Sequence, residues 1–390
     1  MIFETPQLSG ADVAAVQRVD ELRRALAHQV AVPRRWLGSL RRITRARAVQ
    51  ASNSIEGINA SLDDVVAAEE RESPLDATTE TFAALRGYQT AMTYVLQLAR
   101  SSEAVVVDSS LIRALHFMIA SYDLSANPGV WRSGPLWVER DPGNAVVYEG
   151  PPVELVPGLV DELVVSLSDD AGPVIVRAAM AHLNLVMIHP FSDGNGRMAR
   201  CLQSLVLTQE HLLAPEFSSI EEFLGDRTQA YYDVLANVGQ GSWNPGRDAT
   251  PWVRFCLDAH EQQARRLLQR LQDFERLWEQ CAALASRHRL PERVVPALVD
   301  AARGLRLRNS GYRNLVLTSQ GEEITENTAS RDLRAMVEAG VLEPRGERRG
   351  RLYVAGIPLI DAWRDVRSLR PASLGRREAT LRNQDRLPGL

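Results

Sequence analysis

One apolar segment and the proline that follows it constrain the fold of this chain most. Residues 174–188 are almost entirely apolar, and their length and spacing predict a mostly buried helix. Pro190 forces an exit from that helix just after His189. A second helix should begin near Asn195 or Gly196, because the next apolar residues recur at helical spacing: Met198, Cys201, Leu202, Leu205 and Val206. The pattern predicts a mainly helical protein.

The turn between these two helices carries side chains suited to a nucleotide. Residues 189–200 read HPFSDGNGRMAR, in which His189 can take a proton and Asp193 can hold a divalent metal. The Gly-Asn-Gly turn stands at a helix N-terminus, where unpaired N–H groups favour an anion. Arg197 and Arg200 are three apart and can clamp phosphate oxygens. A helix corner with a buried histidine would explain each residue alone, but it explains the whole set poorly.

This stretch resembles the Fic family signature, H-P-F-x-[D/E]-G-N-G-R-x-x-R, with every defining position filled. The resemblance extends over about residues 10–245 and implies a Fic-type helical core. It implies that His189 is a general base and that Asp193 holds Mg²⁺ against the phosphates of ATP. The ATP-binding residues that we expect are Gly194, Asn195, Gly196, Arg197, Met198, Ala199, Arg200 and, packing near the base, Tyr232. For Tyr232, a place in the core is an equal interpretation.

A second motif lies N-terminal to this core. Ser52 and Glu56 are four residues apart and share a helix face, and Gly57 is a natural cap for the end of that helix. Alone, this is an ordinary helix end. Beside a Fic core it resembles the inhibitory motif of the family, [S/T]-x-x-x-E-[G/N]. The resemblance implies that Glu56 pairs with Arg200 and competes with the γ-phosphate of ATP for the same donors.

Two short β-prone runs, 136–138 and 145–148, flank Asp-Pro-Gly-Asn at 141–144 and predict a β-hairpin. In the Fic family a hairpin flap covers the active site and aligns the target protein by strand pairing. The resemblance gives this docking role to Val138, Val146 and Val147. An ordinary surface hairpin would have the same sequence, but its position between the expected helices favours a flap.

The C-terminal part shows a different pattern. Three helical candidates, Arg293–Arg303, Tyr312–Ser319 and Glu326–Ala339, precede a two-stranded wing, and Thr325 is the expected N-cap of the third helix. This order resembles a winged helix-turn-helix. The expected parts are an N-terminal helical region (1–100, with the inhibitory helix at about 40–57), the Fic core (101–245), a connecting helix (246–290), the winged-helix-like domain (291–358) and an arginine-rich tail (359–390).

Winged helices bind DNA through the third helix and a basic wing. The arginines that could contact phosphate here are Arg331, Arg334, Arg345, Arg348, Arg349 and Arg351. Their charge is diluted by neighbouring acids, namely Glu322, Glu323, Glu326, Asp332 and Glu338. We therefore favour protein docking or scaffolding as the role of residues 291–358. DNA binding by these residues stays open, because a fold alone does not give function.

Composition excludes several other classes of protein. The 45 basic residues are all arginine, so a Walker-type P-loop, a protein-kinase lysine and Schiff-base chemistry are excluded. The three cysteines are too scattered for a structural zinc site. With no secretory signal and no long apolar run, we expect a cytoplasmic protein with reduced thiols and no membrane contact. A net charge of −4 argues against a protein that coats nucleic acid.

The sequence thus predicts a Fic-type protein adenylyltransferase (AMPylator) that is autoinhibited by Glu56. It would use ATP and Mg²⁺ to place AMP on a Ser, Thr or Tyr hydroxyl of a target protein. Two alternatives stay open: a Fic enzyme that uses another donor or removes AMP, and a DNA-binding regulator whose Fic core is a nucleotide sensor. The sequence identifies neither the target protein nor whether the chain forms a homo-oligomer.

Overall fold

A computed structural model describes residues 1–101, 105–140, 145–168, 172–347 and 351–370, without the side chains of residues 139, 140, 145 and 146. These residues form two compact units. The first unit contains Met1–Ala31, Thr44–Glu69 and Pro74–Arg265, and the second contains Val32–Ile43, Glu70–Ser73 and the chain from Arg266 onward. The fold is mainly helical, as the sequence predicts.

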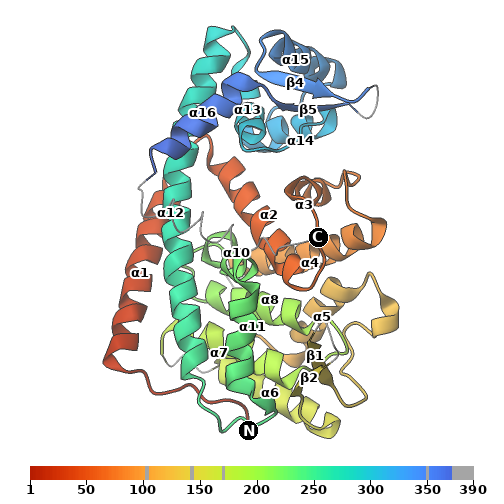
Figure 1. Cartoon of the computed structure of the whole chain (residues 1–390), viewed down its shortest axis with the longest axis vertical. Helices are drawn as coiled ribbons and strands as arrows, with labels where there is room; N and C mark the ends of the chain where they lie inside the picture. The colour runs from red at the N-terminus through yellow and green to blue at the C-terminus, as the bar shows by residue number, and fades with distance from the viewer. Residues whose placement is uncertain (102–104, 141–144, 169–171, 348–350, 371–390) are drawn as a thin grey trace. The chain divides into compact units, whose positions relative to one another are not determined.

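The helices of the first unit can be followed along the chain in Figure 1, and two of them also have residues in the second unit. They are α1 (Gly10–Ala31), α2 (Leu37–Ile55), α3 (Leu62–Glu69), α4 (Thr79–Arg100), α5 (Ser109–Ala120), α6 (Val156–Ser168), α7 (Val174–Ile188), α8 (Asn195–Thr208), α9 (Pro215–Ser218), α10 (Glu221–Asp226), α11 (Thr228–Gly239) and α12 (Thr250–Arg287). Single 3₁₀ turns lie at Leu124–Ala126, Val153–Leu155 and Glu292–Val294. The two helices that have residues in both units are α2 and α12.

The core of the first unit is built around α7 and α8. Every residue of α7 is buried except Arg177 and Val186, as its nearly continuous apolar sequence requires. Helix α8 packs against α7 and is flanked by α4 and α5. Trp252 is fully buried and donates a hydrogen bond from Nε1 to the carbonyl of Ala179, at 2.7 Å. The predicted helix over 174–188 and the predicted helix start at Asn195 are both confirmed.

Side chains define the helix starts around this core. The hydroxyl of Thr78 accepts from the backbone of Thr81 at the start of α4, and the carboxylate of Asp108 accepts from Leu111 at the start of α5. The fully buried carboxylate of Asp64, within α3, accepts from the backbone N–H of Leu75 and so closes the loop that follows the helix.

The predicted hairpin is confirmed and belongs to a three-stranded sheet. Strand β1 (Trp137–Arg140) pairs antiparallel with β2 (Ala145–Glu149), and β2 pairs in parallel with β3 (Gly241–Ser242). The strand order β1-β2-β3 leaves β1 at the edge. The sequence did not predict β3, which has only two residues. The turn at 141–144 and the side chain of Val146, one of the expected docking residues, lie outside the described residues.

The second unit has the order of elements that the sequence predicted for a winged helix-turn-helix. Its elements after α12 are α13 (Val295–Ala302), α14 (Asn309–Gln320), α15 (Glu326–Glu338), β4 (Leu342–Arg345), β5 (Leu352–Ala355) and α16 (Ile357–Ser368). Thr325 caps α15 as expected, accepting from the N–H of Thr328 at 3.1 Å. Residues 359–368, which the sequence analysis placed in the tail, instead belong to α16, a helix that packs against α13. Binding of DNA by this unit stays a prediction, and Arg348 and Arg349 lie outside the described residues.

Within the described ranges, no helix combines the length and the apolar character that crossing a membrane requires.

We expect Gly87→Ala to destabilise the first unit, because α4 and α5 approach closely at this glycine. A Cβ at residue 87 would lie 2.7 Å from the carbonyl oxygen of Ile119 and 2.8 Å from that of Met118. Overpacking against rigid backbone costs about 1–3 kcal/mol, which denaturant unfolding would detect. Gly158→Ala, in α6, is the matched control, since nothing lies within 4 Å of its added methyl group. It should raise stability by up to about 1 kcal/mol. Equal stability of the two variants would contradict this account of the α4–α5 contact.

Candidate active site

The motif at residues 189–200 forms a tight turn between the end of α7 and the start of α8. His189 has φ 51° and ψ 60°, a left-handed conformation that is uncommon for a residue with a side chain. Its N–H donates to the carbonyl of Leu185 at 2.9 Å and so completes the last turn of α7. Gly194, with φ 75°, takes the left-handed position before α8, where a side chain would be strained. Left-handed residues at both ends let the chain reverse within a few residues.

The ring of His189 is set up to accept a proton at one nitrogen. Its Nδ1 lies 2.9 Å from the carbonyl oxygen of Val186. A carbonyl can only accept, so Nδ1 carries the hydrogen and Nε2 keeps its lone pair. Burial lowers the pKa of His189, although the Val186 carbonyl and the Glu56 carboxylate oppose that effect. The imidazole is therefore neutral near pH 7, which is the form that a general base needs.

Asn195 closes the turn with its side chain. Its Oδ1 accepts from the N–H of Phe191 at 2.9 Å, and its Nδ2 donates to the carbonyl of Phe191 at 2.8 Å. The amide is buried, and these two hydrogen bonds use both of its polar atoms within the motif. Only the backbone of Asn195 is left to serve the ATP-binding role that the sequence analysis expects.

His116, on α5, supports the same turn from outside the motif. The N–H of Gly129 donates to its Nδ1 at 2.9 Å, so Nε2 carries the hydrogen and donates to the carbonyl of Asp193 at 2.7 Å. Its ring stacks on Phe191 with centroids 3.5 Å apart. Burial lowers the pKa of His116 to about 4, so the ring is neutral. The sequence does not reveal the role of this residue, because one histidine on the buried face of a predicted helix looks like any core residue.

Arg132 is a second supporting residue that the sequence did not reveal. Its backbone N–H donates to the carbonyl of Pro190 at 2.8 Å, and its Nε donates to that of His189 at 3.0 Å. Its other two nitrogens donate to the carbonyls of Gly134 and Pro151 at 2.7 and 2.5 Å. The residue is 5% exposed, so one buried guanidinium connects the base of the hairpin to the motif turn.

The hairpin has another attachment through β2. The hydroxyl of Tyr148 donates to the carbonyl of Met187, near the end of α7, at 2.8 Å. Val138 pairs with Tyr148 across the two strands, and Val138 and Val147 are both half-buried. The structure thus places the expected flap against the helix that ends at the motif, while its role in docking a target stays a prediction.

Arg197 and Asp193 interact on one side of the turn. The Nη2 of Arg197 lies 3.3 Å from the Asp193 carboxylate and 3.2 Å from the hydroxyl of Tyr122. Arg197 is 1% exposed, whereas the side chain of Asp193 is 59% exposed. The carboxylate oxygens can therefore be reached by a cation from solvent. Met198 and Ala199 are fully buried in the core, so only their backbone could contact a nucleotide.

The residues present fit a magnesium ion that arrives with a nucleotide. No group of three or more His, Cys, Asp or Glu side chains that could hold a metal occurs among the residues that the structure describes. Mg²⁺ commonly takes one or two carboxylates and completes its shell with phosphate oxygens and water. Asp193 can supply one such carboxylate, beside the helix N-terminus and the arginines that would hold the phosphates.

The second arginine of the motif is occupied by the C-terminal end of α2. Arg200 Nη2 donates to the Glu56 carboxylate at 2.7 Å and to the carbonyl of Ser52 at 2.8 Å. Its Nε donates to the hydroxyl of Ser52 at 2.7 Å. The Arg200 side chain is completely buried, and that of Glu56 is 26% exposed. Burial alone would lower the pKa of Arg200, but the Glu56 charge raises it, so the ion pair is intact.

The Glu56 carboxylate also lies directly over the turn. A Cβ on Gly196 would collide with Oε1 of Glu56 and would lie 3.2 Å from Nη1 of Arg200. Gly57, with φ 76°, donates to the carbonyl of Ser54 at 3.0 Å and ends α2 as expected. A negatively charged group thus occupies the N-terminus of α8, where helix geometry favours an anion.

Tyr232 contacts α2 and is not a core tyrosine. Its hydroxyl donates to the carbonyl of Ile55, the last residue of α2, at 2.8 Å, and 43% of the residue is exposed. Its neighbour Tyr231 is the buried one, 1% exposed, and its hydroxyl lies 3.0 Å from Nε2 of His182. A place for Tyr232 near the nucleotide base stays a prediction.

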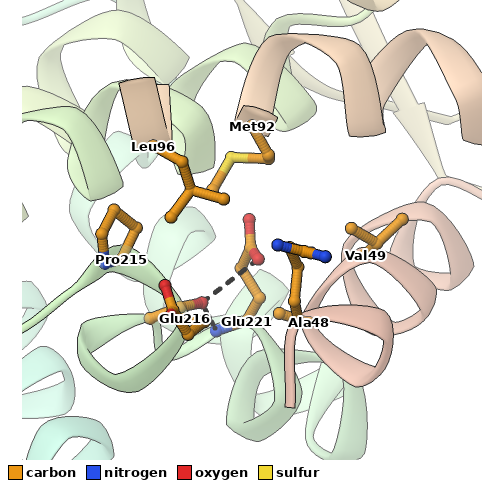
Figure 2. Close-up of a pocket in the computed structure, with 9 residues that line it drawn as sticks. Ala48, Val49, Met92, Leu96, Pro215, Glu216 and Glu221 are labelled. Atoms are coloured by element: carbon orange, nitrogen blue, oxygen red, sulfur yellow. Dashed lines mark hydrogen bonds between the residues drawn. The ribbon is translucent and has the colours of Figure 1, made fainter. Parts of the chain in front are cut away.

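A buried carboxylate, Glu221, stands behind Ser52 and was not predicted from the sequence. It is 2% exposed and accepts hydrogen bonds from Tyr88 and Ser219. Burial raises the pKa of Glu221, against the opposing effects of the Tyr88 hydrogen bond and the Arg200 charge. Figure 2 shows Glu221 at one wall of a small pocket between α2, α4 and the segment from α9 to α10. The pocket-lining residues are Arg45, Ala48, Val49, Met92, Leu96, Pro215, Glu216, Ser219 and Glu221.

We expect acid to weaken the fold partly through His116. Its pKa is about 4 in the folded chain and near 6.5 when unfolded, so below pH 6.5 the unfolded chain binds the proton first. The free energy of unfolding should fall by at most about 1.4 kcal/mol per pH unit between these values, and His116 contributes nothing above them. His116→Asn should reduce this slope in urea unfolding at pH 7, 6 and 5. His211→Asn, at an exposed histidine, should not. Identical slopes in all three proteins would refute the assignment.

Comparison with known proteins places the site in a family. Residues 106–207, which contain the motif turn, match the family model described as Fic/DOC family. The chain is 26% identical over 261 residues to the protein adenylyltransferase Fic of Nematostella vectensis, across 66% of this chain and 56% of that protein. It is 38% identical over 84 residues to the protein adenylyltransferase Fic of Aedes aegypti, across 22% and 14% of the two chains. The match thus spans about half of the first relative and a small part of the second.

Solved structures agree with this assignment. A Fic family protein from Desulfovibrio desulfuricans G20 superposes with a TM-score of 0.57 at 25% identity, over 90% of this chain and 98% of that one. Fic-1 from C. elegans superposes with a TM-score of 0.54 at 24% identity, over 66% and 72% of the two chains, which supports the fold. The motif, the domain match and the fold agree: the chain is a Fic family protein whose Fic domain occupies residues 106–207.

Proposed function

We propose that this chain is a protein adenylyltransferase that transfers AMP from ATP to a Ser, Thr or Tyr hydroxyl of a target protein, and that Glu56 holds it inactive. The curated relatives are named protein adenylyltransferases, but they match at modest identity and over part of their length. The chemistry of the site is therefore the main support for this proposal.

The observation that carries the proposal is the position of the Glu56 carboxylate. It lies over Gly196 at the N-terminus of α8 and is bound to the buried guanidinium of Arg200. A helix N-terminus beside a guanidinium is a binding site for phosphate as well as for carboxylate. The intramolecular carboxylate therefore marks the phosphate site and blocks it at the same time.

The reaction needs a base near the phosphates, and His189 supplies it. Its Nε2 would take the proton of the incoming hydroxyl as the hydroxyl oxygen attacks the α-phosphorus of ATP. The new P–O bond joins AMP to the target, and the bond between the α-phosphorus and the bridging oxygen breaks to release pyrophosphate. The Val186 carbonyl holds the ring in the required tautomer.

The negative charge of the phosphates would be stabilised by groups that the fold already orients. These are the backbone N–H groups at Gly194, Asn195 and Gly196 and the guanidinium groups of Arg197 and Arg200. Mg²⁺, held by Asp193, would neutralise part of the phosphate charge. Because both arginines are buried, they would not have to be desolvated when ATP binds.

The sheet edge offers a way to hold the target. Strand β1 is the outer strand, so its unpaired side can add an extended segment of another protein. Val138 lies on this strand, and Arg132 and Tyr148 fix the hairpin against the motif. A target segment paired with β1 would therefore be held at a constant place relative to His189.

Glu56→Gly should activate the enzyme. Loss of the carboxylate frees the second hydrogen of Arg200 Nη2 and opens the space over Gly196, so the γ-phosphate can bind and the α-phosphate can align with His189. We expect AMP incorporation to rise by about 10- to 100-fold, the usual range for the coupling between a regulatory contact and a site. The gain should appear in turnover more than in ATP affinity. The measurement is transfer of label from [α-³²P]ATP to protein, with mass spectrometry of modified peptides.

Two controls accompany this variant. Glu56→Gln keeps the shape of the side chain and removes its charge, so it should activate as well. Arg200→Ala removes the clamp together with its inhibitor and should stay inactive with or without Glu56→Gly. AMP incorporation by Glu56→Gly at the wild-type level, with ATP and Mg²⁺ saturating, would mean that Glu56 does not inhibit. Incorporation from UTP or another donor instead of ATP would overturn the adenylyltransferase assignment.

Replacement of His189 should abolish transfer and leave nucleotide binding intact. Loss of a positioned general base costs about 10²- to 10⁴-fold in rate. His189 has a left-handed backbone, which Asn tolerates better than Ala does, so His189→Asn is the cleaner variant and His189→Ala its companion. Both are compared in the Glu56→Gly background, by transfer rate and by calorimetric ATP binding. Full activity in either variant would remove His189 from the mechanism.

A further inference from the structure

Arg200 is held by two residues of α2 that use different parts of its guanidinium. Ser52 accepts from Nε through its hydroxyl and from Nη2 through its carbonyl, at 2.7 and 2.8 Å. Glu56 accepts only from Nη2, at 2.7 Å. Nη1 has no hydrogen-bond partner in the described part of the chain, and it faces Gly196. Ser52 thus occupies Nε of Arg200, whereas Glu56 and a phosphate would compete for the nitrogens that face the turn.

The contacts that hold Arg200 are closed to solvent. The hydroxyl oxygen of Ser52 accepts from Arg200 Nε, so its own hydrogen points elsewhere. The buried carboxylate of Glu221 is fixed by hydrogen bonds from Tyr88 and Ser219. Ser52, Tyr88, Arg200 and Glu221 are each at most 2% exposed, so water cannot substitute for any of these contacts.

We propose that Ser52 is a positioning residue for Arg200, holding its guanidinium in the orientation that binds the γ-phosphate of ATP. The inference rests on the proposed function. It gives α2 two opposite effects: Glu56 blocks the arginine, while Ser52, four residues earlier, keeps it correctly oriented. The two contacts of Ser52, with Nε and Nη2 of Arg200, do not involve Glu56.

The test measures nucleotide affinity in the Glu56→Gly background, where the phosphate site is open. The full-length chain is titrated calorimetrically with ATP and with ADP, which lacks the γ-phosphate. The parent variant should bind ATP more tightly than ADP. Ser52→Ala deletes the hydroxyl but keeps the backbone carbonyl, so Arg200 loses its Nε contact and keeps one Nη2 contact.

Ser52→Ala should weaken ATP binding by about 10- to 100-fold, as expected for one lost hydrogen bond to a charged group, with ADP affinity unchanged. Ser52→Thr restores a hydroxyl and should restore the preference for ATP. Ser54→Ala is the matched control, because its hydroxyl bonds the carbonyl of Ala51 on the same helix and should have no effect. A general weakening of α2 would lower the affinity for both nucleotides or appear in the Ser54 variant.

ATP preference that survives Ser52→Ala, or equal losses for ATP and ADP, would overturn this inference alone. Equal affinity for ATP and ADP in the Glu56→Gly parent would overturn it together with the proposed γ-phosphate role of Arg200.

Discussion

The burial of the Arg200 guanidinium is the constraint on which the rest of the site depends. A charge with a completely buried side chain is tolerated only when opposite charge and hydrogen-bond acceptors surround it. Glu56, Ser52 and, one step behind, Glu221 meet this requirement. The packing of α2 against the core therefore supplies the groups that allow Arg200 to be buried. The Glu56 carboxylate is the group that neutralises the arginine.

Buried polar groups fix the turn beneath that arginine. His116 donates to the carbonyl of Asp193, and Asn195 binds both backbone groups of Phe191. Arg132 donates to the carbonyls of His189 and Pro190. Electrostatic stabilisation of a transition state depends on donors that do not have to reorganise during the reaction. These contacts use four carbonyl groups and the N–H of Phe191, and none of them involves the N–H groups at the start of α8.

Sequence patterns reveal the site residues that lie close together in the chain, but not those that reach the site only through the tertiary fold. The motif turn is predictable because twelve contiguous residues carry its chemistry, and Ser52 and Glu56 are predictable because they repeat at helical spacing. His116, Arg132 and Glu221 have no neighbouring pattern, since each reaches the site only through the tertiary fold. Helix α16 and strand β3 were missed because tertiary contacts, with α13 and with β2, decide their structure.

The two roles of α2 bear on how the proposed enzyme could become active. Removal of the whole helix would leave Arg200 buried without the partners that Ser52 and Glu56 provide, and breaking a buried ionic contact commonly costs about 3–5 kcal/mol. The Glu56 side chain is 26% exposed and stands at the end of the helix, beside Gly57. Displacing this one carboxylate requires far less rearrangement. Activation of the proposed enzyme is therefore best served by a local movement at the end of α2 that releases Glu56 while Ser52 remains on Arg200.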